Sequence, residues 1–256
     1  MKINLKKLFV TAVIGVGVFV SQPAHAFAGY DFDYIGFQIE QDTLKRTFDY
    51  YNQVTSTNDI LEKSSNSKST GSSKSKSSSS QTSSKPKPAK KAKITFKSDR
   101  STRGLDYLVN NYPSKQRGEA RIYLKKMYDS FPQVARSVGI PTNDLSSGMV
   151  AILAGAYMAY NNVSLNDSYM KPMANQFKAH LENSGFFDEM SNREKKSMYD
   201  QMVMVGMTLA VGQSLNQSNP NSQTTAQLRE AGKQILEAIL KVDAGRVRIT
   251  AQGISY

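Results

Sequence analysis

The 256-residue chain contains no cysteine, which excludes disulfides, thiolate metal sites and a cysteine nucleophile. Histidine is almost as rare, because only His25 and His180 occur. A zinc site takes several His or Cys ligands, so we predict neither a metal site nor a cofactor. No Gly-x-Ser-x-Gly motif of a hydrolase accompanies the two histidines. The sequence therefore contains no residue to which we assign a catalytic role.

The chain also lacks an apolar run long enough to cross a bilayer, for which about 20 residues are needed. The longest run, residues 8–20, follows a basic start and is followed by the cleavage-site pattern Ala24-His25-Ala26. This arrangement predicts a signal peptide over residues 1–26. We therefore expect an exported protein, in the periplasm, at the cell surface or outside the cell, with no transmembrane span in the mature chain.

Acidic residues are missing from residues 63–93, which consist largely of Ser and Lys and include nine Lys. This segment has almost no apolar side chains to bury, so we predict a disordered linker with a root-mean-square reach of roughly 30 Å. The favoured interpretation is a spacer, and the alternative is salt-sensitive attraction to an anionic envelope polymer. We expect no specific nucleic-acid binding, because the excess positive charge is concentrated in this linker. The candidate polymer-binding residues are Lys85, Lys87, Lys90 and Lys91.

Residues 27–62 carry the opposite charge, with seven acidic residues against two basic ones, and are rich in aromatic side chains. Disordered chains are poor in aromatics, so we predict that this segment docks on another surface. The favoured interpretation is that it covers the protein's own helical domain, because chain termini are usually ordered only when tied down. The alternative is that it binds an envelope protein partner by strand addition. The candidate docking residues are Tyr30, Phe32, Tyr34 and Phe37.

Residues 94–256 show helical periodicity almost throughout, which predicts an all-α, five-helix bundle-like domain. Two predicted helices, near residues 142–161 and 191–212, contain long charge-free stretches, which are typical of the centre of a bundle. Their strictly apolar parts have 12 and 10 residues, too few to span a membrane. The remaining predicted helices cover about residues 114–131, 167–183 and 222–242.

Local signals predict where several of these helices begin and end. Ser114 and Ser191 are predicted N-caps, and Ser191 belongs to a capping box with Glu194. Pro132 is expected to interrupt the first predicted helix, and Gly245 is expected to end the last one.

The predicted layout is a signal peptide, an acidic aromatic docking segment, a disordered Ser/Lys-rich linker and a helical domain. Two short extended pieces near the ends of the domain are candidates for a small two-stranded ribbon. The boundaries of the four parts are 1–26, 27–62, 63–93 and 94–256, and the extended pieces are residues 94–96 and 247–250.

Two further sets of side chains invite a functional interpretation, but each has a simpler structural one. Paired carboxylates can hydrolyse glycans, yet the available glutamates show no recognisable signature and are expected to be solvated or capping residues. Tyrosines and arginines near helix ends would line a groove if those ends met; the favoured interpretation places the tyrosine rings at the rim of the core. The glutamates are Glu119, Glu182, Glu189 and Glu194, and the groove residues are Tyr157, Tyr160, Arg117 and Arg121.

Three motifs resemble an uncharacterised family of exported bacterial proteins with a domain of unknown function. They are YPSKQR at residues 112–117, GIPTNDL at 139–145 and AGAYMAYN at 154–161. The resemblance covers about residues 100–253. It implies an all-helical envelope domain and supplies no activity, cofactor or site.

These observations predict a non-enzymatic binding or assembly protein of the cell envelope or the extracellular space. The first alternative is an enzyme that cleaves cell-wall glycans, and the second is a membrane-active secreted effector. An open groove lined by two carboxylates would favour the enzyme.

Overall fold

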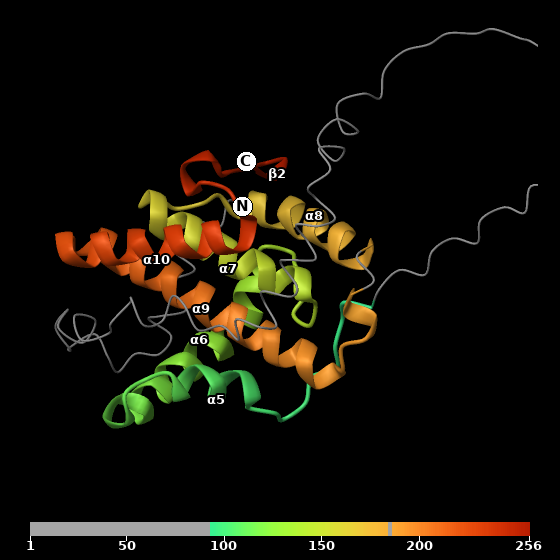
Figure 1. Cartoon of the computed structure of the whole chain (residues 1–256). Helices are drawn as coiled ribbons and strands as arrows, with labels where there is room; N and C mark the ends of the chain where they lie inside the picture. Colours follow the sequence, from blue (N-terminus) through green and yellow to red (C-terminus); the bar gives the residue numbers. More distant parts are fainter. Residues whose placement is uncertain (1–92, 184–185) are drawn as a thin grey trace, which may run out of the picture.

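The computed structural model describes residues 93–183 and 186–256, which form an all-α domain with a small ribbon (Figure 1). Within these residues there are six α-helices, one more than predicted, because a short helix, α5, precedes the first expected one. None of the described helices is long and apolar enough to be a membrane span. The helices are α5 (Arg103–Asn110), α6 (Arg117–Ser137), α7 (Leu145–Asn161), α8 (Met170–Asn183), α9 (Asn192–Ser218) and α10 (Ser222–Leu240).

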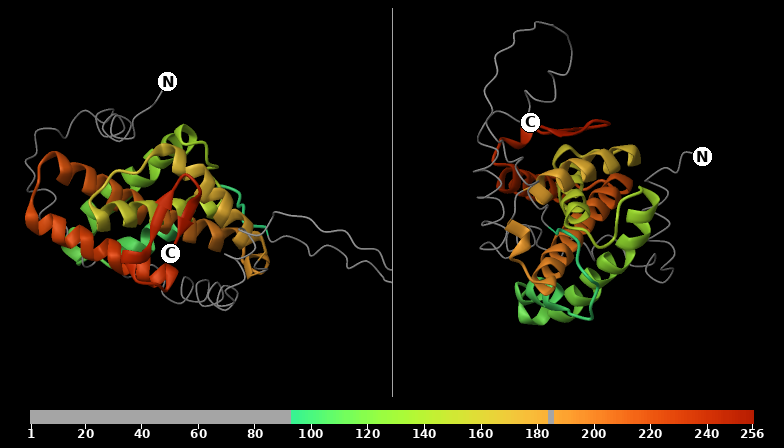
Figure 2. Two further views of the ribbon diagram at one scale, coloured as in Figure 1. Left: turned by 90° about the horizontal axis from the view of Figure 1, so that it is seen from above. Right: turned by 90° about the vertical axis from the view of Figure 1, so that its right-hand side faces the viewer.

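Helices α7 and α9 form the centre of the domain, with α8 and α10 packed on α7 and with α5 and α6 packed on α9 (Figure 2). The central pair crosses at glycines. A Cβ added to Gly155 would lie 2.2 Å from the carbonyl oxygen of Gly206, and one added to Gly206 would lie 2.2 Å from that of Ala151. Only residues without a side chain permit this approach. The prediction that the charge-free helices are central is confirmed.

The N-termini of both central helices are capped by side chains. The side chain of Asp144 accepts a hydrogen bond from the backbone N–H of Ser146 at 2.8 Å. At the start of α9, the Glu194 N–H donates to Ser191 Oγ at 3.3 Å, and the Ser191 N–H donates to Glu194 Oε2 at 2.7 Å. The predicted capping box is therefore confirmed.

Helix α6 differs from the prediction at two places. Ser114 is not its N-cap, because Ser114–Gln116 form a separate 3-10 turn and the helix begins after it without a capping side chain. Pro132 does not interrupt the helix, which continues for another turn. Phe131 and Val134 extend its buried face across the proline, and burial of that face offsets the single backbone hydrogen bond lost at Pro132.

The C-terminus of α10 also differs from the prediction. The helix ends with Lys241 in the left-handed conformation (φ 55°), and its N–H donates to the Glu237 carbonyl at 2.9 Å, so Gly245 is not the stop. Upstream, Gly232 sets the contact with α7, since an added Cβ would lie 2.4 Å from the Ala156 carbonyl oxygen. The backbones of α9 and α10 therefore both lie in close contact with the backbone of α7.

The small ribbon lies entirely at the C-terminus, where β1 (Arg248–Thr250) pairs antiparallel with β2 (Gly253–Ser255). The small two-stranded ribbon is confirmed, but residues 94–96 are not one of its strands, because a tight turn lets β1 pair with the chain that directly follows it. Helix α8 covers the ribbon: the Gln176 side chain accepts from the Ile254 N–H and donates to its carbonyl, both at 2.9 Å.

Residues 93–101 form an extended segment, here called the strap, that lies between α9 and the start of α7. Ile94 and Phe96 are buried to 2% and 5% exposure. The Ile94 carbonyl accepts from the Leu145 N–H at 3.2 Å. On the other side, the Asn192 side chain accepts from the Lys97 N–H at 2.5 Å and donates to its carbonyl at 2.8 Å. The strap therefore enters the domain in a fixed position.

Candidate functional site

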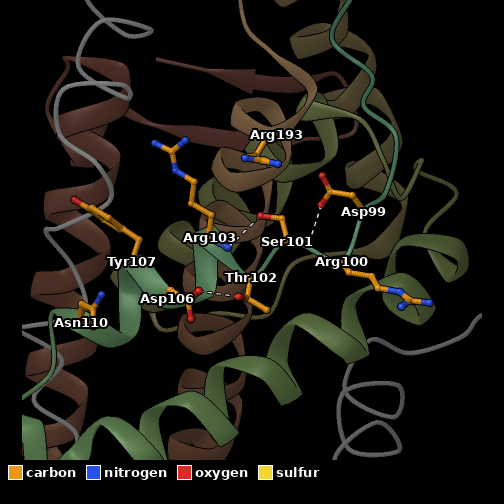
Figure 3. A pocket seen from close by; sticks show the side chains of 9 residues that line it. All are labelled: Asp99, Arg100, Ser101, Thr102, Arg103, Asp106, Tyr107, Asn110 and Arg193. Atoms are coloured by element: carbon orange, nitrogen blue, oxygen red, sulfur yellow. Dashed lines mark hydrogen bonds between the residues drawn. The ribbon is translucent and has the colours of Figure 1, made fainter.

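A surface depression of about 750 Å³ lies where the end of the strap meets α5 and the first turn of α9 (Figure 3). Its lining is polar and charged, and it includes three arginines, two aspartates and one tyrosine. We call it the arginine pocket. It is lined by Asp99, Arg100, Ser101, Thr102, Arg103, Asp106, Tyr107, Asn110 and Arg193.

Three segments supply the arginines. Arg100 lies in the strap, Arg103 is the first residue of α5, and Arg193 is the second residue of α9, in the turn that the capping box begins. Figure 3 shows the side chains of Arg103 and Arg100 directed to different sides, with Ser101 and Thr102 between them. The side chains of Arg100 and Arg193 are exposed, and neither forms an ion pair with a carboxylate in the described part of the chain.

Both aspartates of the pocket accept hydrogen bonds from within the protein. The Asp106 carboxylate accepts from Thr102 Oγ1 at 2.7 Å and lies 2.6 Å from an Arg121 guanidinium nitrogen of α6. The hydrogen bond from Thr102, together with Arg121, outweighs partial burial and holds the pKa of Asp106 below its ordinary value. Asp99 accepts from the Ser101 N–H at 2.9 Å. Beside the exposed carboxylate of Asp99, the pocket therefore presents the guanidinium groups of Arg100 and Arg193 to a ligand.

A buried ion pair lies behind the pocket. Lys196 Nζ donates to Asp200 at 2.5 Å and to the Ser101 carbonyl at 2.9 Å, and both charged side chains are only 5% exposed. Burial raises the pKa of Asp200, and Lys196 opposes that shift. Burial and the nearby Asp200 carboxylate raise the pKa of Tyr128 in α6. These contacts join the strap, α6 and α9 behind the pocket.

The residues predicted to bind partners all lie outside the described residues, so the structure does not test whether they lie close together. They are the aromatic candidates Tyr30, Phe32, Tyr34 and Phe37 and the linker candidates Lys85, Lys87, Lys90 and Lys91.

The candidate catalytic groups are dispersed. His180 is half-buried in α8, where burial lowers its pKa. Glu119 lies in the first turn of α6, Glu182 lies 3.9 Å from Lys178 in α8, and Glu194 belongs to the capping box. Among residues 93–183 and 186–256, no three His, Asp or Glu side chains lie close enough together to hold a metal ion.

The groove suggested by tyrosines and arginines near helix ends does not form. Arg117 donates to the carbonyls of Asn110 and Tyr112, both at 2.9 Å, and thereby closes the C-terminus of α5. Arg121 is paired at the arginine pocket. Tyr160 lies instead beside α10, with the Arg229 guanidinium 5.5 Å from its ring centre.

The arginine pocket itself was not predicted. Helix α5, which supplies four of its nine lining residues, was missed, although Leu105, Leu108 and Val109 show the i, i+3, i+4 spacing of a buried helix face. The capping box at Ser191 placed Arg193 in a first helical turn. No signal in the sequence indicated that this turn lies beside the strap.

A family model described as a family of unknown function (DUF6683) matches residues 8–256, and the chain belongs to this family. The match confirms the resemblance to an uncharacterised domain family. It covers far more of the chain than residues 100–253, because it includes the predicted docking segment and linker. Neither a curated protein nor a solved structure matches the chain.

Proposed function

We propose that this member of the DUF6683 family is a non-enzymatic binding or assembly protein of the cell envelope or the extracellular space. The observation that carries the proposal is the arginine pocket, where the side chains of Arg100 and Arg193 are exposed. A guanidinium group binds a carboxylate through two parallel hydrogen bonds. The ligand class is therefore an acidic surface of a partner protein. The signal-peptide pattern of residues 1–26 supports the export half of the proposal.

The two carboxylates of the pocket raise the question of a glycan-cleaving enzyme. Such an enzyme needs one carboxyl group with a raised pKa, so that it can protonate the leaving oxygen. The pKa of Asp106 is shifted in the opposite direction, by Thr102 and Arg121. Asp106 is thus suited to holding Arg121 and Thr102 in place, and the pocket favours binding over catalysis.

The N-terminal parts of the chain have separate roles in this proposal. The acidic aromatic segment, residues 27–62, is a second docking element for an envelope protein, and the Lys-rich linker is a spacer with salt-sensitive affinity for anionic envelope polymers. Their composition supports these roles.

Capture of partners from envelope extracts tests the proposal. The full chain is compared with Arg100→Glu/Arg193→Glu and with a control, Arg136→Glu/Lys233→Glu, which reverses two exposed charges away from the pocket. We expect the pocket variant to lose the specific partners and the control to retain them. Equal capture by the two variants would contradict the proposal. Release of soluble fragments from purified peptidoglycan, abolished by Asp99→Asn/Asp106→Asn, would establish the enzyme instead.

A further inference from the structure

The arginine pocket is divided between two parts of the chain that meet where the strap docks on α9. We infer that residues 97–101, here called the outer strap, form a movable wall of the pocket that closes with the ligand. Asn192 is the positioning residue that holds this wall closed. The inference rests on the proposed function, since it takes the pocket to bind acidic ligands, and it deepens that function by naming how binding there is regulated.

The two halves of the strap are attached to the domain in different ways. In the first half, the side chains of Ile94 and Phe96 are buried. The Ile94 carbonyl accepts from the Leu145 N–H at 3.2 Å, and the Phe96 N–H donates to the Asn143 carbonyl at 3.1 Å. The outer strap, in contrast, contributes no buried side chain. Burial of apolar surface therefore stabilises the docking of the first half only.

Side chains from the first two turns of α9 hold the outer strap. The Asn192 side chain accepts from the Lys97 N–H at 2.5 Å and donates to the Lys97 carbonyl at 2.8 Å, while Lys196 Nζ donates to the Ser101 carbonyl at 2.9 Å. A hydrogen bond contributes little net stability by itself, and a segment without buried apolar contacts opens locally at low cost. The outer strap is therefore expected to open and close while the domain stays folded.

Opening of the outer strap separates the charged groups of the pocket. The outer strap supplies Arg100, whereas α9 supplies Arg193 (Figure 3). The backbone of Lys97 is attached to Asn192, the residue directly before Arg193. These hydrogen bonds thus keep the two arginines in one pocket. A ligand that pairs with both guanidinium groups bridges the strap and α9.

Ligand binding and strap docking must then reinforce one another, because the coupling between two equilibria is reciprocal. A peptide that needs both Arg100 and Arg193 binds only the closed pocket, so its affinity is reduced by the fraction of molecules in which the outer strap is open. The bound peptide in turn keeps the outer strap docked. The partner is therefore an acidic segment with at least two carboxylates, one for each guanidinium group.

Hydrogen exchange of the outer strap tests the inference, with hexaglutamate as the acidic probe. The full chain is measured by mass spectrometry at low salt, where charge interactions are not screened. With the probe at about ten times its Kd, exchange of residues 97–101 should slow roughly tenfold, because the probe binds the closed pocket only. In Arg100→Glu/Arg193→Glu the probe should leave this exchange unchanged. The same variant measures the background binding of hexaglutamate to the linker lysines.

Asn192→Ala removes the hydrogen bonds at Lys97 and leaves both pocket arginines in place. This variant should bind hexaglutamate roughly 3- to 10-fold more weakly than the parent chain, and its outer strap should exchange faster without the probe. Asn221→Ala is the matched control, because Asn221 caps α10 by accepting from the Thr224 N–H at 2.9 Å, and α10 supplies no residue to the pocket. The control should lower the melting temperature and keep the parent affinity, so that a general loss of stability does not imitate the expected effect.

Two outcomes would overturn the inference. One is exchange of residues 97–101 that stays the same when hexaglutamate is bound, and the other is parent affinity in Asn192→Ala. Either result, with hexaglutamate bound through the pocket arginines, leaves the proposed function standing. Hexaglutamate that binds the parent chain no more tightly than Arg100→Glu/Arg193→Glu would contradict the acidic ligand of the proposed function, and the inference with it.

Discussion

Gly155 and Gly206 determine how closely the two central helices approach, because each faces the backbone of the opposite helix. Replacing Gly155 with Leu forces a side chain into a space that the Gly206 carbonyl occupies. We expect the variant to lose roughly 1–3 kcal/mol of unfolding free energy, or more, measured by thermal or denaturant unfolding. Gly118→Ala is the control: an added Cβ there meets open space, and it should be neutral or slightly stabilising. An unchanged melting temperature for Gly155→Leu would contradict the described crossing.

The buried Lys196–Asp200 ion pair is a second contact that we expect to stabilise the fold only while both side chains are present. Removal of Lys196 alone, as Lys196→Met, leaves a buried carboxylate without its cation and should cost roughly 3–5 kcal/mol. The double variant Lys196→Met/Asp200→Leu removes both charges and should recover most of that loss. Unfolding free energies of the two single variants and the double variant form the required cycle. Simple additivity of the two losses would show that the side chains do not act as a pair.

At the scale of single elements, the N-terminus of α9 allows a test of how much the charge of Glu194 contributes to stability. The hydrogen bonds from the Ser191 side chain and backbone lower the pKa of Glu194 from its ordinary value of 4.5. A carboxylate with a lowered pKa in the folded state stabilises the fold above its unfolded pKa, and this contribution is lost as the pH falls through the folded pKa. Glu194→Gln should therefore lower the melting temperature at pH 7, and the difference from the parent chain should shrink as the pH falls below 4.5 and through the lowered folded-state pKa of Glu194. A difference that is constant with pH would assign the effect to side-chain shape.

Ser191→Ala tests the other half of the same capping box. Loss of the side-chain acceptor should cost roughly 1 kcal/mol at neutral pH. Because the Ser191 hydroxyl is the largest contribution to the lowered pKa of Glu194, the variant should also weaken the pH dependence of stability in acid. Unfolding measured at several pH values separates the two effects. No change in either quantity would mean that the capping box contributes nothing to α9.

The sequence predicted those elements whose local signals agree with their burial. Helices α7 and α9 combine charge-free stretches with capping residues, and both were expected at the centre of the domain. Pro132 was misjudged because burial of Phe131 and Val134 overrides a local helix breaker. The ribbon was expected, but its second strand, Gly253–Ser255, was not identified, because short extended pieces carry no information on which segment they pair with. The arginine pocket was missed because Arg193 is brought to the strap and α5 by contacts such as that of Lys97 with Asn192, which are 95 positions apart.

At the scale of the whole molecule, the strap defines where the domain begins. Its backbone is engaged from Lys93, whose N–H donates to Asp188 and whose carbonyl accepts from Lys195. The sequence predicts a disordered linker over residues 63–93, and Lys93 is held in the domain, so limited trypsin digestion should cut the linker before Lys93 and leave a stable fragment beginning near residue 92. Mass spectrometry of the fragment identifies the last cut. Protection of the linker lysines in the isolated protein would contradict the predicted spacer.

The acidic aromatic segment should carry partner binding without carrying the stability of the domain. Apolar side chains that are exposed together usually mark an interaction site, and residues 27–62 lie outside the described residues. Replacing Tyr30, Phe32 and Tyr34 with Ser should therefore abolish capture of envelope proteins, while the melting temperature of the full chain stays within a few degrees of the parent value.

A matched linker variant separates the two kinds of association. Replacing Lys85, Lys87, Lys90 and Lys91 with Ser should weaken only the salt-sensitive binding to anionic polymers and leave protein capture unchanged. A large drop in melting temperature for the aromatic variant would make the segment part of the fold. Unchanged capture would show that the segment does not bind these partners. The arginine pocket would then be the site at which partners have to be sought, because its guanidinium groups do not depend on the N-terminal aromatics.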